Sequence, residues 1–426
     1  MKIYRANIIF TPAPDKLKLI PHGYIVVGSN GLIEGIYTEL PEHMDWRRQV
    51  IDFGDKLLIP AFNDLHVHAP QYRNLGLALD MELLPWLNTY TFTEETKYAD
   101  PEYAGRMYRR FVHELWMQGT MRAAVFGTIH PEATRILADL FVQAGMGARV
   151  GLVGMNRNCP NTLGNTTESL MEGMRMLKAH LDEYGGNGLV SPIITPRFIP
   201  SCTPDMLKAL GNYAAETGLP VQSHLSENRS EIEWVRELEP DSTCYGDAYN
   251  RYGLFGQTPT LMAHCCYSGE EELALMRQNG VCVVHCPMSN SNLSSGIAPI
   301  RTYLERGIHV AMGTDVSAGH SMSMLRAMQY AIQVSKLHYA ASHGEVRFLT
   351  LSEVFYLATK AGGLFFGKVG SFEPGYEFDA LLVDDHYLNY DNYTLEQRLE
   401  RYLYLGDDRD IKRRFCRGVE LVEPAY

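Results

Sequence analysis

The sequence predicts an α/β fold, a (β/α)8 TIM barrel with a small β-sandwich domain built from both termini. Three observations lead to this prediction. Apolar runs of strand length alternate with segments of helical period through the middle of the chain, these strand-like runs number eight, and both ends consist of short strand-like segments separated by Gly and Pro. Eight parallel strands in series are the number that closes a barrel.

The two ends of the chain have the same texture. Strand-like segments near the N-terminus cover residues 3–10, 23–28 and 31–35, and those near the C-terminus cover residues 380–384 and 414–422. Because both ends are β-rich while the middle alternates, we expect residues 1–59 and 369–426 to form one composite β domain beside a catalytic barrel of residues 60–368.

The middle of the chain supplies the barrel. The expected strands are short apolar runs at residues 57–62, 121–128, 150–155, 189–195, 219–223, 260–263, 281–284 and 308–313. The segments of helical period between them cover residues 104–118, 132–144, 167–183, 204–217, 230–237, 269–279 and 297–305. The carboxyl ends of such strands meet on one face of the barrel, where active sites of this fold lie.

Four of the expected strands end in residues that bind metal ions. His66 and His68 follow the first strand, His224 the fifth, His264 the sixth and Asp315 the eighth. Two histidines separated by one residue in an extended chain point to the same side, so His66 and His68 can reach one ion. Imidazole nitrogens and one carboxylate suit a divalent metal such as Zn²⁺, with a position left open for water. The His-x-His pair alone also fits two incidental polar residues, but the full set at successive strand ends indicates a metal site.

The residues at the end of the fourth strand predict one metal ion per subunit. Barrel hydrolases of this type that hold two ions usually bridge them with a carbamylated lysine at the end of the fourth strand. Here that strand ends in Thr195-Pro-Arg-Phe198, and the only lysine between residues 101 and 200 is Lys178, within a helical segment. A guanidinium stays protonated and does not carbamylate. We therefore expect a single zinc, with iron as the alternative metal.

One ion at this face predicts hydrolytic chemistry. The metal lowers the pKa of a bound water and generates hydroxide for attack. Asp315 can bind the metal and accept the proton of this water, and Glu227, three residues beyond His224, is placed to carry a proton to a ring nitrogen. His264 can bind the ion or, as we favour, hydrogen-bond the hydroxide and stabilise the tetrahedral intermediate. The alternative for Glu227 is a solvated carboxylate in a loop.

Longer runs around these residues resemble the amidohydrolase superfamily, and within its metal-dependent deaminase branch the guanine deaminases, over nearly the whole chain. The metal-binding set is common to many deaminases of the superfamily and identifies only the chemistry. The resemblance includes Glu94-Glu95 and Ser223-His-Leu-Ser-Glu-Asn-Arg229, and four runs are much narrower in occurrence: Ala69-Pro-Gln-Tyr72, Trp86-Leu-Asn-Thr-Tyr-Thr-Phe92, Thr195-Pro-Arg-Phe198 and Leu405-Gly-Asp-Asp-Arg409.

The resemblance implies a zinc enzyme that converts guanine to xanthine and ammonia. It implies that His66, His68, His224 and Asp315 hold the metal, that His264 contacts the water, and that Glu227 delivers a proton to N3. It also implies that Gln71, Arg197 and Phe198 hold the purine. The donors of Arg197 suit the O6 acceptor, and Gln71 offers a donor and an acceptor to the ring edge. A structural ion pair for Arg197, a position at the pocket rim for Gln71 and a core position for Phe198 stay open as alternatives.

Other functions also stay open. Another aminated ring, such as an aminotriazine, cytosine, adenine or a guanine analogue, needs the same chemistry, although adenine lacks the 6-oxo group that Arg197 would bind. Cyclic-amide hydrolysis of the dihydroorotase or hydantoinase type generally uses the two-metal site with its lysine. A barrel that has lost catalysis and serves as a scaffold typically lacks the metal ligands that this chain retains.

Composition limits the expected partners. A formal net charge of −12 without a Lys/Arg tract argues against nucleic acid, and no apolar stretch is long enough to span a membrane. The eight cysteines lack the spacing of a secreted scaffold and indicate reduced thiols in a cytoplasmic enzyme. We therefore expect a small-molecule purine as the partner, and a homodimer, which is typical of the family that the chain resembles.

Overall fold

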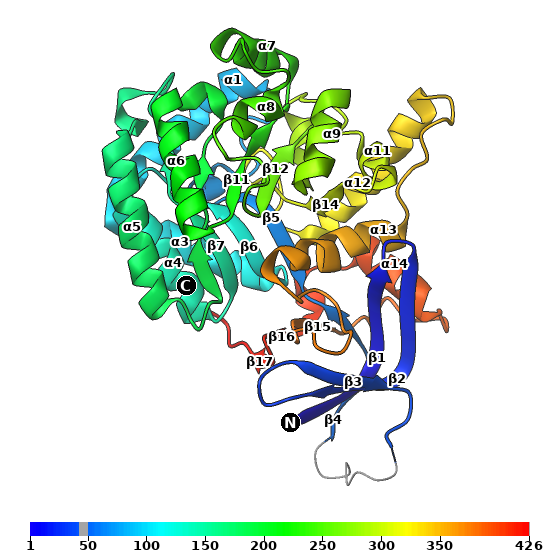
Figure 1. Cartoon of the computed structure of the whole chain (residues 1–426). Coiled ribbons are helices and arrows are strands. Elements are labelled where there is room, and N and C mark those ends of the chain that lie inside the picture. The colour runs from blue at the N-terminus through cyan, green and yellow to red at the C-terminus, as the bar shows by residue number, and fades with distance from the viewer. Residues whose placement is uncertain (42–49, 426) are drawn as a thin grey trace.

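Eight parallel strands form the centre of the molecule in the computed structural model, which describes residues 1–41 and 50–425 (Figure 1). Residues 42–49 of the expected composite β domain, and Tyr426 at its end, lie outside the described residues. The barrel strands are β5 (Phe62–His68), β6 (Thr120–Phe126), β7 (Gly147–Gly151), β9 (Val190–Pro192), β11 (Val221–Leu225), β12 (Thr260–His264), β13 (Cys282–His285) and β14 (His309–Met312).

Backbone hydrogen bonds close these strands into a barrel. They form two four-stranded parallel sheets, β5-β6-β7-β9 and β11-β12-β13-β14, and a short parallel pair of β8 (Val153–Gly154) with β10 (Thr195–Pro196) extends the third and fourth strands. A parallel bridge between Ile194 and Val221 joins the two sheets on one side. On the other side the Asp315 amide donates to the His66 carbonyl at 2.8 Å, and the His68 amide donates to the Val316 carbonyl at 3.1 Å. The predicted TIM barrel is confirmed.

Helices follow the strands and cover the outside of the barrel (Figure 1). The longer ones begin and end where the sequence supplies caps: Thr203 accepts from the Met206 amide at the start of α6, and Gly218 ends it in the left-handed region, at φ 69°. The helices are α1 (Leu83–Trp86), α2 (Phe92–Glu95), α3 (Pro101–Met117), α4 (Pro131–Ala144), α5 (Thr167–Tyr184), α6 (Pro204–Thr217), α7 (Arg229–Leu238), α8 (Tyr245–Asn250), α9 (Glu270–Asn279), α10 (Pro287–Asn292), α11 (Ile300–Glu305), α12 (Met324–Ala341), α13 (Leu351–Tyr356) and α14 (Leu395–Leu405).

The first predicted strand, residues 57–62, is wrong in its bounds. Residues 57–60 end β4 (Val50–Pro60) in another sheet, whereas the barrel strand β5 begins at Phe62 and contains His66 and His68. The chain changes sheets within two residues, because the Ala61 amide donates to the Asp379 carbonyl and the next amide, of Phe62, donates to the Gly119 carbonyl, each at 3.1 Å. The apolar run therefore spans the end of one strand and the start of the next.

A seven-stranded sheet combines both ends of the chain, as predicted. Its order is β17-β16-β15-β4-β1-β2-β3, from β1 (Lys2–Ala13), β2 (Lys16–Val27), β3 (Ile33–Tyr37), β4, β15 (Ala380–Val383), β16 (Ile411–Cys416) and β17 (Val419–Glu420). Tyr4 of β1 and Phe415 of β16 lie three strands apart in this order, about 14 Å in a flat sheet. Their ring centroids are nevertheless 5.4 Å apart, so the sheet folds over on itself and its two halves pack like a β-sandwich. The helix α14 between β15 and β16 was not predicted.

A buried ion pair ties this sheet to the barrel. Arg122 of β6 donates to both carboxylate oxygens of Asp379, at 2.7 and 3.1 Å, and it also contacts Glu377. Arg122 and Asp379 are 2% and 1% exposed, so neither charge has water as an alternative partner. The eight cysteines are free thiols, six of them buried. Among the described helices, none has the length and apolar character needed to cross a membrane.

Candidate active site

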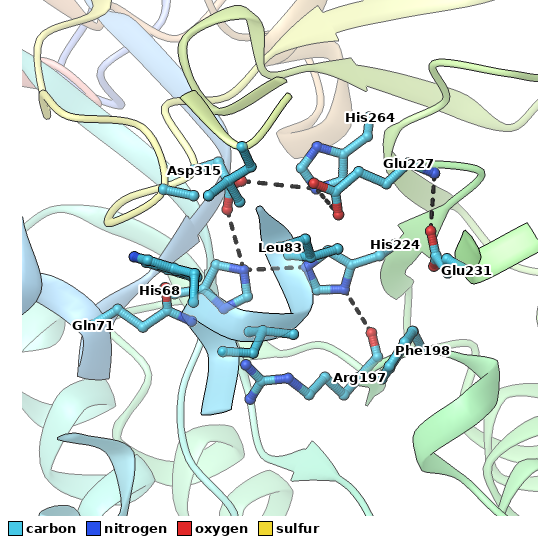
Figure 2. Close-up of a pocket in the computed structure, with 14 residues that line it drawn as sticks. His68, Gln71, Leu83, Arg197, Phe198, His224, Glu227, Glu231, His264 and Asp315 are labelled. Carbon is cyan, nitrogen blue, oxygen red and sulfur yellow. Dashed lines mark hydrogen bonds and ion pairs between the residues drawn. The ribbon is translucent and has the colours of Figure 1, made fainter. Parts of the chain in front are cut away.

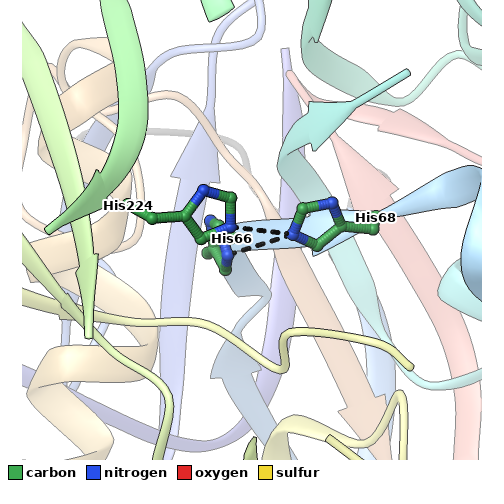
Figure 3. Close-up of side chains that lie close together, drawn as sticks. All are labelled: His66, His68 and His224. Atoms are coloured by element: carbon green, nitrogen blue, oxygen red, sulfur yellow. Dashed lines mark hydrogen bonds between the residues drawn. The ribbon is translucent and has the colours of Figure 1, made fainter. Parts of the chain in front are cut away.

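Three histidines and one aspartate converge at the carboxyl ends of β5, β11 and β14. The Nε2 atom of His68 lies 3.3 Å from Nε2 of His66 and 3.2 Å from Nε2 of His224 (Figure 3). Oδ1 of Asp315 lies 3.2 Å from Nε2 of His66 and 3.3 Å from Nε2 of His68. Two ligand atoms 3.2 to 3.3 Å apart can share one Zn²⁺ ion at its usual distance of about 2.0 Å from nitrogen or oxygen. The structure thus brings together all four predicted metal ligands.

The close approach of β14 to β5 places Asp315 in this cluster. A side chain at position 313 would meet the Cβ of His66 at 2.7 Å, so only glycine fits there. Two residues later, Asp315 has a φ of 50°, a left-handed conformation that turns its carboxylate back over β5. Asp64 fastens the same crossing, because its Oδ1 accepts from the amides of His66 and Thr314 at 3.2 and 3.0 Å.

The hydrogen bonds of His224 prepare it as a metal ligand. Its Nδ1 lies 2.6 Å from the carbonyl oxygen of Arg197, which can only accept, so Nδ1 carries the proton. In the neutral ring Nε2 then has the lone pair, and this atom faces His68. A carbonyl that orients an imidazole in this way is the usual support of a metal-binding histidine.

Burial and charge set the ionisation of these groups. Burial lowers the pKa of His66 to about 4 and holds the pKa of His224 well below its ordinary value, so both rings are neutral and can bind a metal. Burial works to raise the pKa of Asp315, but the neighbouring imidazoles, His66 first, outweigh it and hold that pKa well below its usual range. A carboxylate among imidazole lone pairs is a donor set suited to a divalent cation.

Glu227 and His264 lie beside this cluster (Figure 2). Nε2 of His264 is 3.6 Å from Oε2 of Glu227 and 3.8 Å from Oδ2 of Asp315, and its Nδ1 is 2.9 Å from Oδ1 of Asn290. The other oxygen of Glu227 accepts from Ser295 Oγ at 2.7 Å. Glu227 is 4% exposed, so it is not the solvated loop carboxylate that was its alternative.

The pKa of each partner in this pair is raised. Burial raises the pKa of Glu227, and Asp315 adds to the effect, while His264 and the Ser295 hydroxyl oppose it. Burial alone would lower the pKa of His264, but the Glu227 and Asp315 carboxylates and the Asn290 contact outweigh it and raise that pKa. A buried carboxylate with a raised pKa is typical of a group that transfers protons.

These residues open onto one cavity, which encloses about 460 Å³ including space that is open to solvent. The predicted substrate-binding residues Gln71, Arg197 and Phe198 all line it (Figure 2). Phe198 is only partly buried and meets Trp234 edge to face at 6.2 Å, so it is not a core residue. Arg197 does form an ion pair, with Glu95 at 2.7 Å, yet it also lines the pocket.

Several residues of the site were not predicted. The remaining wall is mostly apolar, from Leu83, Trp86, Leu87, Leu293 and Ala318, with Glu231 as a further carboxyl. The spacing Asn228-x-x-Glu231 is a helix capping box, which signals the start of α7 but not a pocket wall. Glu95 and Ser295 act on site residues from outside the wall, and no local pattern marks them.

Comparison with known proteins agrees with this geometry. The model of the Amidohydrolase family matches residues 57–421. A guanine deaminase of Dictyostelium discoideum is 35% identical over 98% of this chain and 97% of its own length. A guanine deaminase of Mus musculus is 39% identical, over 86% of this chain and 83% of its own.

Solved structures show the same relationship. The crystal structure of a guanine deaminase from C. acetobutylicum, with guanine bound in the active site, has a TM-score of 0.96 and 46% identity, over 99% of this chain and 100% of that one. The E. coli guanine deaminase has a TM-score of 0.89 and 32% identity, with both chains fully covered. The chain therefore belongs to the amidohydrolase family and, within it, to the guanine deaminases.

Proposed function

We propose that this chain hydrolyses guanine to xanthine and ammonia, with one zinc ion per subunit held by His66, His68, His224 and Asp315. The observation that carries the proposal is a single cavity whose wall combines three of these donors, His68, His224 and Asp315, with the buried carboxyl of Glu227 and the pair Gln71 and Arg197. The fourth donor, His66, lies behind this wall, with its Nε2 3.3 Å from Nε2 of His68. The relatives named above, all guanine deaminases, support guanine as the substrate.

The donor set fits zinc on chemical grounds. Neutral imidazoles and an ionised carboxylate are its common ligands, and four pairs of these donor atoms lie 3.2 to 3.3 Å apart. A zinc ion bound there would supply Lewis acidity and lower the pKa of a coordinated water. The chain lacks the lysine that would bridge a second ion at the end of the fourth strand, which supports a single ion. Lys178, the one lysine between residues 101 and 200, lies on α5 and pairs with Asp182.

The chain's own residues would move the protons. Ser295 holds one oxygen of Glu227, which leaves the other, Oε2, to take a proton from the attacking water and deliver it to N3 of the ring. A protonated His264 would stabilise negative charge on the attacking oxygen. Asp315, which has an oxygen 3.8 Å from His264, would take the second proton of the water and pass it to the amino group, which leaves as ammonia. Arg197 would donate to O6, and Phe198 and the apolar wall would cover the ring.

We also propose that catalysis belongs to residues 60–368 and that residues 1–59 with 369–426 form the supporting β domain. Every residue of the proposed site lies between Asp64 and Ala318. The buried apolar cluster that contains Tyr4, Phe53 and Phe415 draws its members from the seven-stranded sheet and the segments next to it, which supports a separate core.

The test is metal analysis together with xanthine formation by the wild type and Glu227→Gln. The variant should retain about one zinc per subunit while kcat falls by about 10² to 10⁴, the usual contribution of a general acid and base. Glu233→Gln is the matched control, because Glu233 is exposed on the helix next to Glu227 and should keep full activity.

Three results would count against the proposal. Near-normal turnover by Glu227→Gln would remove Glu227 from the mechanism, and two ions per subunit would contradict the single site. Faster ammonia release from an aminotriazine, cytosine or adenine than from guanine would show that guanine is not the preferred substrate.

A further inference from the structure

Two adjacent buried carboxylates at the end of α2 have different partners. Glu94 contacts Arg73, Lys97 and Tyr103, away from the pocket. Glu95 faces the other way and accepts from Gln71 Nε2 at 3.0 Å and from Arg197 Nη1 at 2.7 Å. Glu95 thus contacts both of the polar residues assigned to the substrate, without lining the pocket itself.

Glu95 determines which way the Gln71 amide points. A carboxylate can only accept, so the group next to Glu95 must be the NH2 of Gln71. On the other side the Ser317 amide, which can only donate, lies 3.3 Å from Gln71 Oε1. The reverse orientation would bring donor to donor and acceptor to acceptor. One N–H and one lone pair of Gln71 are then left, at known positions, for a ligand.

Glu95 also determines the charge that Arg197 presents. The two side chains are 6% and 5% exposed, and the guanidinium lies 5.2 Å from the ring centroid of Phe92. At this burial the pair behaves as a neutral unit that retains free N–H donors. Arg197 is the only Lys or Arg among the described residues that line the pocket, whereas three carboxyls, those of Glu227, Glu231 and Asp315, line it.

We propose that Glu95 is a positioning residue that makes the pocket specific for an uncharged heterocycle. It holds Gln71 and Arg197 as hydrogen-bond donors and acceptors for a neutral 6-oxopurine, and it cancels the positive charge that would otherwise attract an anionic ring. The inference rests on the proposed function, because it takes the cavity to be the purine site.

Two purines without a 2-amino group provide the test: hypoxanthine, which is neutral at pH 7, and urate, which is an anion. Their dissociation constants are measured by calorimetry on the zinc-loaded wild type and on Glu95→Gln, Glu95→Asp and Glu94→Gln. In Glu95→Gln the amide of Gln71 is free to turn, so hypoxanthine should bind about tenfold more weakly. The charge of Arg197 is also unpaired and attracts an anion, so the Kd of urate divided by the Kd of hypoxanthine should fall by about tenfold or more.

The other two variants separate charge from position. Glu95→Asp keeps the charge but shortens the reach, so hypoxanthine should bind more weakly while the ratio stays at the wild-type value. Glu94→Gln removes a neighbouring buried carboxylate that does not touch the pocket residues, and its ratio should also stay unchanged.

Each contrary outcome is distinct. An unchanged ratio in Glu95→Gln, or an equal fall in Glu94→Gln, overturns the inference. If Glu95→Gln does not fold, unaltered hypoxanthine binding by Glu95→Asp overturns the positioning role instead. Failure of the proposed function would appear separately, as a wild type that forms no xanthine from guanine.

Discussion

Replacement of Ser295 by alanine tests how the proposed proton shuttle is held. The Ser295 hydroxyl is fully buried and donates to Glu227 Oε1 at 2.7 Å, so it fixes the carboxylate and stabilises its charged form. A hydrogen bond to a buried charged group contributes about 1.5–3 kcal/mol. Since about 1.4 kcal/mol corresponds to a factor of ten, kcat/KM for guanine should fall roughly 10- to 150-fold.

The pH profile gives a second, independent reading of Ser295→Ala. Loss of the hydroxyl raises the pKa of Glu227 further, since the Ser295 contact lowers it in the native protein. The acid limb of kcat/KM, which requires the carboxylate, should therefore move to higher pH.

Xanthine formation measured across the pH range, at constant zinc content, is the assay for Ser295→Ala. Ser291→Ala is the matched control, because the Ser291 hydroxyl donates to the Pro287 carbonyl within α10 and not to Glu227. Activity within about twofold of the wild type, with an unmoved acid limb, would refute the reasoning, because one lost bond at the lower estimate already costs tenfold.

Two further predictions concern stability. Arg122→Met leaves Asp379 buried without its main partner and should lower the free energy of unfolding by about 3–5 kcal/mol in denaturant titrations. The control Arg135→Met breaks an exposed pair and should change the free energy of unfolding by less than about 1 kcal/mol. Similar effects of the two variants would contradict the importance of the buried pair. Burial raises the pKa of Glu231 from 4.5 to about 7, and the negative charge of Glu227 adds to this rise. The folded protein therefore keeps this proton at pH values where the unfolded chain has lost it. The contribution of Glu231 to the free energy of unfolding is complete below pH 4.5 and is lost as the pH rises through about 7. Glu231→Gln should lack that decline, with a relative gain of up to about 3 kcal/mol across the window, and parallel stability curves for the two proteins would contradict it.

Periodicity predicted the barrel well because each βα unit buries its own apolar residues. It failed at β5, whose seven residues are all buried although Asn63, Asp64, His66 and His68 are polar. Their partners lie far along the chain: the Thr314 amide for Asp64, the Thr359 carbonyl for Asn63 and the other ligands for the histidines. The longer helices α12 and α14 and the short helices α1, α2, α8, α10 and α13 were also not predicted. The short ones lack the long amphipathic repeat that indicates a helix.

Residue type and position at strand ends were enough to predict that His66, His68, His224 and Asp315 converge. The residues that orient the site were harder to find, because Glu95, Asn290 and Ser295 act through contacts between segments that are remote in sequence. Resemblance singled out Glu94-Glu95, but only the coordinates show that the two carboxylates face opposite ways. The expected homodimer stays a prediction.

The direct passage from β4 into β5 has a consequence for biogenesis. One side of β4 pairs with β1, which is synthesised first, but the other side pairs with β15, so that Leu58 meets Leu382 and Ile59 meets Leu381. Until residues 380–383 leave the ribosome, this apolar strand has an open edge of the kind that promotes aggregation. Ala61 alone separates β4 from β5, so this late pairing directly adjoins the strand that carries His66 and His68.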